Sequence, residues 1–254
     1  MAALIKTNEE IAKIREAGKI LAKVLQELIL QAREGLVLKD LDDLAYGLIL
    51  KAHAKPAFLG YQPGGASRPF PASLCTSVNE VVVHGVPSKR RLKSGDLLKL
   101  DLGVNYDGYN ADAAISMGIG EISRLAQELI GATKKALAAA IAAVKPGNTL
   151  GDIGYVIKKT ASDHNFKVLK ELTGHGIGKA LHEEPTIFNE GTPGRGEMLR
   201  VGMVLAIEPM LSAGSDQVKQ LPDESYASVD QSLNAHFEHT IAITEQGPEI
   251  LTML

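Results

Sequence analysis

The sequence predicts an α+β fold with two similar halves, each made of two helices followed by antiparallel strands. Apolar and polar residues alternate over 98–103, and a turn rich in Asn, Asp and Gly separates them from a second strand over 109–117. This pattern is typical of a β-hairpin. The Gly, Leu and Asp of residues 35–40 recur as Gly147, Leu150 and Asp152, at a constant spacing of 112 residues. The spacing indicates an internal repeat, and a cleft between two halves is a common place for a site.

The composition is that of a soluble globular protein. The 254 residues are 45% hydrophobic and 22% charged, with a net charge of −3 that argues against a dedicated nucleic-acid surface. The single cysteine excludes an internal disulfide and suits a reducing compartment. The first twenty residues contain no apolar segment that could serve as a signal sequence or membrane span. We therefore expect a cytoplasmic protein, and the repeat predicts one domain over 1–254 whose halves cover about 7–118 and 121–250.

Helix signals open the first half. Thr7 and Glu10 have the spacing of a capping box, and apolar residues at helical intervals behind them extend to about residue 32. Asp40 is predicted to cap a second helix, which ends before Pro56.

Loops and strands follow, and the helix signals then return. A Gly- and Pro-rich loop covers 60–71, and a short strand leads to His84. In the second half the patterns predict helices over 123–144 and to about residue 164, strands over 203–207 and 235–244, and loops over 189–200 and 212–232.

Two aspartates of the predicted hairpin are the first candidates for chemistry. If the turn is centred between Tyr106 and Asp107, Asp101 and Asp112 face each other across the strands, with Cβ atoms roughly 5 Å apart. One aspartate could belong to the turn while the other is solvated, the pair could share one proton, or a cation could lie between them.

Three further residues favour the cation. Glu208 and Glu238 stand in strongly apolar segments, where burying an unpaired carboxylate costs several kcal/mol. His175 adds an imidazole. Four carboxylates and one histidine, with few lysines or arginines nearby, suit two divalent first-row ions bridged by carboxylates. A dinuclear metal site is the leading interpretation, and the ligand types do not distinguish Co, Mn, Fe and Zn.

Other interpretations use the same part of the sequence. The Gly-rich run 174–178 permits a phosphate-binding loop, although no parallel βαβ pattern surrounds it. Cys75 could be a nucleophile, but most single cysteines are packing residues. His84 and His182 lie in turns that a substrate could reach. The remaining histidines are interpreted as surface or packing residues: His53, His164, His236 and His239.

Five motifs carry a resemblance to a known family. They are Asp101 followed eleven residues later by Asp112, GHGIG around His175, His182 seven residues further on, AIEP with Glu208, and FEHT with Glu238. In this order they resemble a type I methionine aminopeptidase of the bacterial kind, in peptidase family M24, over nearly the whole chain. The resemblance implies the pita-bread fold, a curved antiparallel sheet with helices on one face and two pseudo-symmetric halves. No zinc-finger extension precedes Thr7, and no helical insertion interrupts the second half.

The resemblance also implies ligand roles. Asp112 and Glu238 would bridge the two ions, Asp101 would bind one of them, and His175 and Glu208 would bind the other. The ions would acidify a water that attacks the first peptide carbonyl.

The same resemblance implies a reaction. Glu208 would accept the proton of the water, while His84 and His182 would hydrogen-bond the peptide and the tetrahedral intermediate. The implied function is removal of the initiator methionine from peptides and nascent chains with a small second residue, at the ribosome. The Met1-Ala2 start of this chain would itself be a substrate.

The methionine pocket departs from the family pattern. Tyr61, Cys75 and Leu181 match lining positions, whereas the tryptophan common before the last glutamate is missing and Tyr226 is expected in its place. Gly103 stands where many members have threonine.

The resemblance leaves further partners and functions to weigh. Asn79 and Val81 match positions that bind a structural monovalent cation in some members. An Xaa-Pro aminopeptidase or dipeptidase shares the five ligands, but those enzymes usually carry an added N-terminal domain. A binding protein on the same fold would have lost its ligands, which are all present here.

Overall fold

The structure is a computed structural model that describes residues 3–253, so the Met1-Ala2 start lies outside the described residues. The described helices are α1 (Asn8–Gln31), α2 (Leu38–Lys51), α3 (Arg124–Ala143) and α4 (Leu150–Asp163). The described strands are β1 (Lys55–Pro56), β2 (Leu74–Val78), β3 (Val81–Val83), β4 (Leu97–Tyr106), β5 (Tyr109–Gly118), β6 (Lys167–Val168), β7 (Thr173–Gly176), β8 (Glu183–Phe188), β9 (Val204–Ile207), β10 (Met210–Ser212), β11 (Val218–Gln220), β12 (Tyr226–Ser228), β13 (Asn234–His236), β14 (His239–Thr244) and β15 (Gly247–Ile250).

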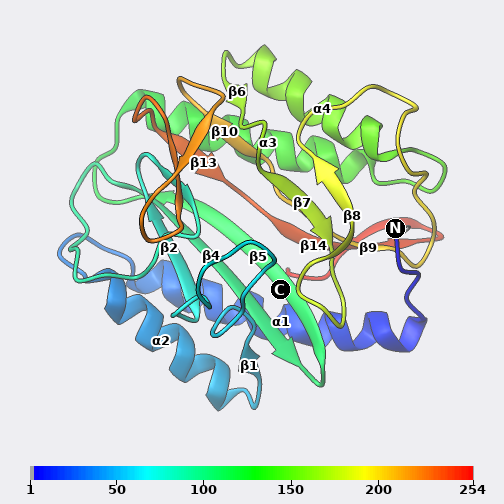
Figure 1. Ribbon diagram of the computed structural model, residues 1–254, viewed down its shortest axis with the longest axis horizontal. Helices are drawn as coiled ribbons and strands as arrows, with labels where there is room; N and C mark the ends of the chain where they lie inside the picture. The colour runs from blue at the N-terminus through cyan, green and yellow to red at the C-terminus, as the bar shows by residue number, and fades with distance from the viewer. Residues whose placement is uncertain (1–2, 254) are drawn as a thin grey trace.

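Antiparallel strands form the middle of the molecule. The β4–β5 hairpin crosses it, with α1 and α2 on one side and α3 and α4 on the other (Figure 1). Strands β1, β4, β2 and β5 form one sheet, and β15, β14, β9, β7 and β8 form another. Helix α1 packs on β4 and β5, whereas α3 packs on β5, β9, β10 and β13. No helix within 3–253 is both long and apolar enough to cross a membrane.

The helix pairs repeat with the spacing predicted from the sequence. Helices α2 and α4 begin at Leu38 and Leu150. Before them, Gly35 and Gly147 adopt φ of +83° and +92°, a region that glycine enters without steric cost. Each glycine N–H donates to a carbonyl of a distant segment in its own half, at 2.8 and 3.0 Å. The same loop conformation therefore precedes the second helix of both halves.

The predicted cap of α2 is wrong. Val37 is the residue before the helix, and Asp40 lies in its first turn without capping it. The backbone N–H groups of Leu38 and Lys39 instead donate to carbonyls of the segment 88–90, each at 3.0 Å. Because a neighbouring segment satisfies these donors, no capping side chain is needed.

The hairpin register also differs from the prediction. Asp101 opposes Ala114, and Asp112 opposes Gly103. The turn is centred on Asp107-Gly108, one residue later than expected, and both turn residues have positive φ. A two-residue turn of this kind matches the twist of the strands. The two aspartates therefore lie on one face of the sheet as diagonal neighbours, not directly opposed.

The strand predicted over 235–244 is interrupted. Its first part, β13, pairs with β10, and its second part, β14, pairs with β9. Between them the backbone N–H of Glu238 donates to the carbonyl of Ala114 on β5 at 2.9 Å. The break places Glu238 beside the β4–β5 hairpin.

The segment 212–232, predicted as loop, contains two strands. Strand β11 pairs with β12, and β12 pairs with β3. Each has three residues, which is too short to show an alternating pattern in the sequence. The pairing brings Tyr226 opposite Val83, next to His84.

Candidate metal centre

A cavity of about 980 Å³ is lined by residues of both halves. All five residues expected to bind metal line it: Asp101, Asp112, His175, Glu208 and Glu238. So do the residues expected to contact substrate: Tyr61, Cys75, His84, Leu181, His182 and Tyr226. The fold thus gathers every predicted site residue around one space.

Each candidate ligand comes from a different strand or strand end. Asp101 is on β4 and Asp112 on β5, while His175 is on β7. Glu208 follows the last residue of β9, and Glu238 lies in the break between β13 and β14. Strands β7 and β9 pair side by side, so His175 and Glu208 face the cavity from one sheet, opposite the hairpin.

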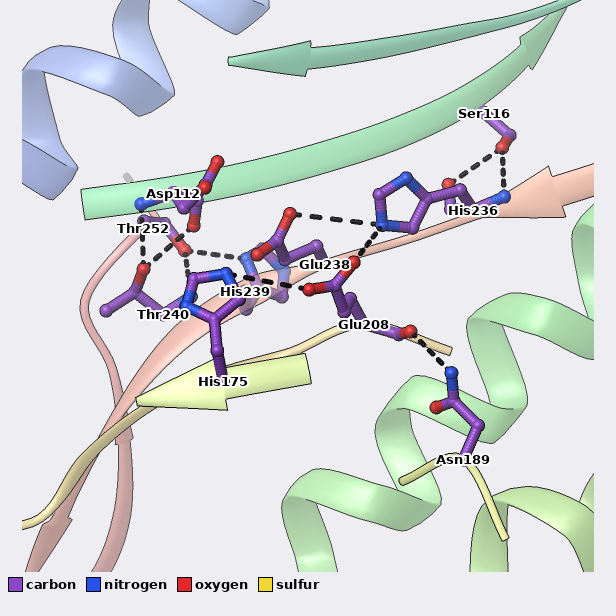
Figure 2. A network of polar contacts seen from close by, with 10 residues as sticks. All are labelled: Asp112, Ser116, His175, Asn189, Glu208, His236, Glu238, His239, Thr240 and Thr252. Carbon is purple, nitrogen blue, oxygen red and sulfur yellow. Dashed lines mark hydrogen bonds and ion pairs between the residues drawn. The ribbon is translucent and has the colours of Figure 1, made fainter. Parts of the chain in front are cut away.

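The side chains converge closely. Two groups of three side chains each place one possible ligand atom per residue within 4.8 Å of the others. They are Asp112, His175 and Glu238, and Glu208, His236 and Glu238. The Nε2 atom of His175 lies 3.6 Å from Oε1 of Glu208 (Figure 2). Divalent ions are bound by groups at such spacings.

Electrostatics makes this cluster unfavourable without a cation. Burial raises the pKa of Asp101 and of Glu208 to about 7. It raises the pKa of Asp112 and of Glu238 well above the usual range, and the neighbouring carboxylates raise both further. Within residues 3–253, the buried oxygens Oδ1 of Asp101, Oδ1 of Asp112 and Oε1 of Glu238 accept no hydrogen bond. Such orphaned oxygen donors fit divalent metal ions, which would supply the missing positive charge.

Two neutral histidines stand beside the carboxylates. Burial lowers the pKa of His84 to about 4, and burial together with the charge of His175 lowers that of His182 to about 3. Tyr61 Oη lies 2.8 Å from Nδ1 of His182, whose ring centroid is 4.3 Å from that of His175. The ring of His84 packs edge-on against Tyr226, with centroids 5.9 Å apart. Both imidazoles are uncharged at neutral pH and can each donate one hydrogen bond.

His236 is a site residue that the sequence interpretation missed. It is only 1% exposed, and its Nε2 lies 3.3 Å from Oε2 of Glu208 and 3.9 Å from Oε2 of Glu238. Figure 2 shows a dashed line from the ring to each of the two carboxylates. Neither ring nitrogen has a hydrogen-bond partner within 3–253. Side chains alternate between the two faces of the strand predicted over 235–244, so His236 and Glu238 share one face. This pattern could have identified His236 as a site residue.

The rival interpretations are not supported. Burial, and then the charge of Asp101, raise the pKa of the Cys75 thiol well above its usual range, so it is a poor nucleophile. The glycines around His175 serve strand packing. A Cβ on Gly174 would lie 2.4 Å from the carbonyl O of Ala206, and one on Gly176 would lie 2.2 Å from that of Glu184.

Packing accounts for the glycine at position 103. A Cβ on Gly103 would lie 2.6 Å from Cε1 of Phe58, so the Phe58 ring occupies the space of a larger side chain. At the positions expected to bind a monovalent cation, the carbonyl O of Asn79 accepts a hydrogen bond from Lys99 Nζ at 2.7 Å.

Comparison with known proteins agrees with this architecture. The model of metallopeptidase family M24 matches residues 12–245. A methionine aminopeptidase of Clostridium acetobutylicum is 46% identical over 252 residues, which cover 98% of each chain. The crystal structure of a methionine aminopeptidase from Thermotoga maritima superposes with a TM-score of 0.95 at 43% identity, covering 99% of this chain and 100% of that one.

A prolidase from Pyrococcus furiosus is a more distant match. It superposes with a TM-score of 0.75 at 25% identity, and the matched region covers 99% of this chain but 66% of the prolidase. These likenesses confirm the predicted pita-bread fold. The chain therefore belongs to metallopeptidase family M24, in its type I methionine aminopeptidase branch.

Proposed function

We propose that this protein removes the N-terminal methionine from peptides and nascent chains whose second residue is small, using two divalent metal ions. The observation that carries the proposal is the group of buried carboxylates, three of them with an oxygen that accepts no hydrogen bond, on the wall of a cavity between the two halves. The family of the chain agrees with it. We further propose that the chain acts as a monomer in the cytoplasm, as one catalytic domain with halves 7–118 and 121–250, on chains leaving the ribosome.

The proposed ligand set is the one implied by the family resemblance. Asp112 and Glu238 would be shared by the two ions, Asp101 would hold one of them, and His175 and Glu208 would hold the other. When bound, divalent ions acidify a water and polarise the carbonyl of the first peptide bond. The proximity of Asp112, His175 and Glu238 supports the assignment.

The chain's own residues then handle the proton and the substrate. Glu208 would accept the proton of the attacking water. His236, whose Nε2 atom lies 3.3 Å from Oε2 of Glu208, would keep that carboxylate oriented by this contact. His182 and His84 are uncharged and hydrogen-bond the peptide, and they stabilise negative charge that develops on the carbonyl oxygen. Tyr61 fixes the ring of His182 through its Nδ1 atom.

The methionine side chain is assigned to the part of the cavity lined by Tyr61, Cys75 and Leu181, with Tyr226 in place of the missing tryptophan. The buried thiol of Cys75 is uncharged and offers a polarisable contact to the thioether.

Peptide hydrolysis by metal-stripped protein tests the proposal. With Met-Ala-Ser and Ala-Pro-Ala as substrates, we expect release of methionine from the first peptide only, and only after addition of Mn²⁺ or Co²⁺. Cleavage of the proline peptide would show instead that the protein has the specificity of an Xaa-Pro aminopeptidase or dipeptidase. Cleavage of neither peptide by metal-loaded protein would favour a binding function.

A further inference from the structure

Lys99 is a buried cation that the proposed reaction does not use. It lies on β4 and is only 1% exposed. Its Nζ atom is 2.7 Å from the carbonyl O of Asn79, 3.0 Å from Oδ1 of Asn234 and 3.2 Å from the carbonyl O of Asn234. All three acceptors are uncharged amide oxygens. An ammonium group surrounded in this way is held by dipoles and not by an opposite charge.

The number and orientation of the acceptors favour the charged form of Lys99. An ammonium group has three N–H donors for three oxygens, whereas a neutral amine has two. The Asn234 side chain is fixed by its other end, because Nδ2 donates to the carbonyl O of Glu80 at 2.9 Å and to Oγ of Ser228 at 3.1 Å. These contacts hold its Oδ1 toward the ammonium.

The three segments joined by Lys99 all lead into the metal centre. Strand β4 carries Asp101 two residues after Lys99. The turn between β2 and β3 leads to His84, and β13 leads to Glu238. The ammonium is thus a common contact for the backbone segments that place a metal ligand from each half and a substrate-binding histidine.

We propose that Lys99 is an internal substitute for a bound monovalent cation, and that the oxygens of Asn79 and Asn234 form a site for K⁺, Na⁺ or NH₄⁺ when the lysine is shortened. Amide and carbonyl oxygens are the ligands that bind K⁺ in proteins. Lys99 is then a positioning residue that acts through the strands it joins. The native protein consequently needs no monovalent cation for its stability.

The test compares wild-type protein with Lys99→Ala in KCl, NaCl, NH₄Cl and choline chloride at equal ionic strength. Choline is too large for the space left by the side chain. We expect Lys99→Ala to lose stability in choline and to regain at least half of the loss in one of the small cations. In choline its affinity for Mn²⁺, measured by calorimetry, should fall about tenfold and recover with the same cation. Wild-type protein should unfold at the same temperature in all four salts.

Lys99→Gln is the matched control, because its amide keeps two N–H donors and fills the space. Its stability should not depend on which salt is present. Equal stability of Lys99→Ala in choline and in every small cation would overturn the proposal. If that variant does not fold, selective stabilisation of the wild-type protein by K⁺ over choline would overturn it instead. The stability measurements do not depend on the proposed peptidase reaction, so failure of either proposal can be recognised separately.

Discussion

Replacing Asp101 by asparagine should stabilise the metal-free protein, although Asp101 is a proposed metal ligand. The carboxyl group ionises at about pH 3.8 when exposed, and burial raises its pKa in the folded protein to about 7. Ionisation therefore penalises folding increasingly as the pH rises from about 4 to about 7, and the penalty is constant above that. A shift of about three units corresponds to about 4 kcal/mol, which is an upper limit because neighbouring carboxylates relax when one charge is lost.

Denaturant unfolding in the presence of a chelator measures this effect. Asp101→Asn should be more stable than wild type by up to about 4 kcal/mol at pH 8 and nearly equal to it at pH 4.5. With Mn²⁺ at about 100 times its dissociation constant, wild type should gain about 3 kcal/mol, and the variant should gain less.

A second buried aspartate is the matched control. Oδ1 of Asp42 accepts hydrogen bonds from the backbone N–H groups of Ser73 and Leu74, and its Oδ2 pairs with Lys39. Asp42→Asn should therefore destabilise the protein at pH 8, by about 1 kcal/mol. We expect ionisation of the buried Asp101 carboxyl group to destabilise the metal-free protein. A metal-free Asp101→Asn protein that is no more stable than wild type at pH 8 would refute this expectation.

Three further changes probe the site. His182→Ala should reduce kcat about a hundredfold or more while metal content, read by elemental analysis, stays unchanged, and loss of metal would contradict its assignment to substrate. His236→Ala should weaken Mn²⁺ binding in calorimetry about tenfold, whereas His236→Gln, which keeps a donor, should retain it; equal affinities of all three proteins would exclude the orienting role. Gly103→Thr should lower the free energy of unfolding by about 1–3 kcal/mol because the new side chain overlaps Phe58, and Phe58→Leu in the same chain should recover part of the loss.

The sequence predicted the helices well because they depend on local patterns, and the residues that it singled out line one cavity. Helix α1 carries the capping box of Thr7 and Glu10 that the sequence predicted, and the ligand motifs keep fixed spacings. Errors arose where a distant segment decides the local structure. The first turn of α2 is satisfied by the segment 88–90, and β12 exists only because β3 pairs with it. No residue within those two stretches indicates which distant segment will form hydrogen bonds with it.

His236 and Gly103 illustrate two different limits. His236 stood on the predicted face of Glu238, so its role could have been inferred, but the distance to Glu208 depends on how β9 and β13 are placed. The glycine at position 103 could be noticed in the sequence but not explained, because Phe58 is far from it along the chain.

The contact between the two halves passes through the proposed metal centre. Thr240 Oγ1 accepts from the backbone N–H of Asp112 at 2.9 Å and donates to its carbonyl O at 2.8 Å, beside the Glu238 contact with Ala114. Separating the halves would therefore break these bonds and move the proposed ligands apart. If the proposed ligands bind metal, a folding intermediate with only one half formed would hold an incomplete set of them, and we expect metal binding to follow the docking of the halves. Bound metal should likewise slow amide hydrogen exchange along β5 and β14 more than in the outer helices.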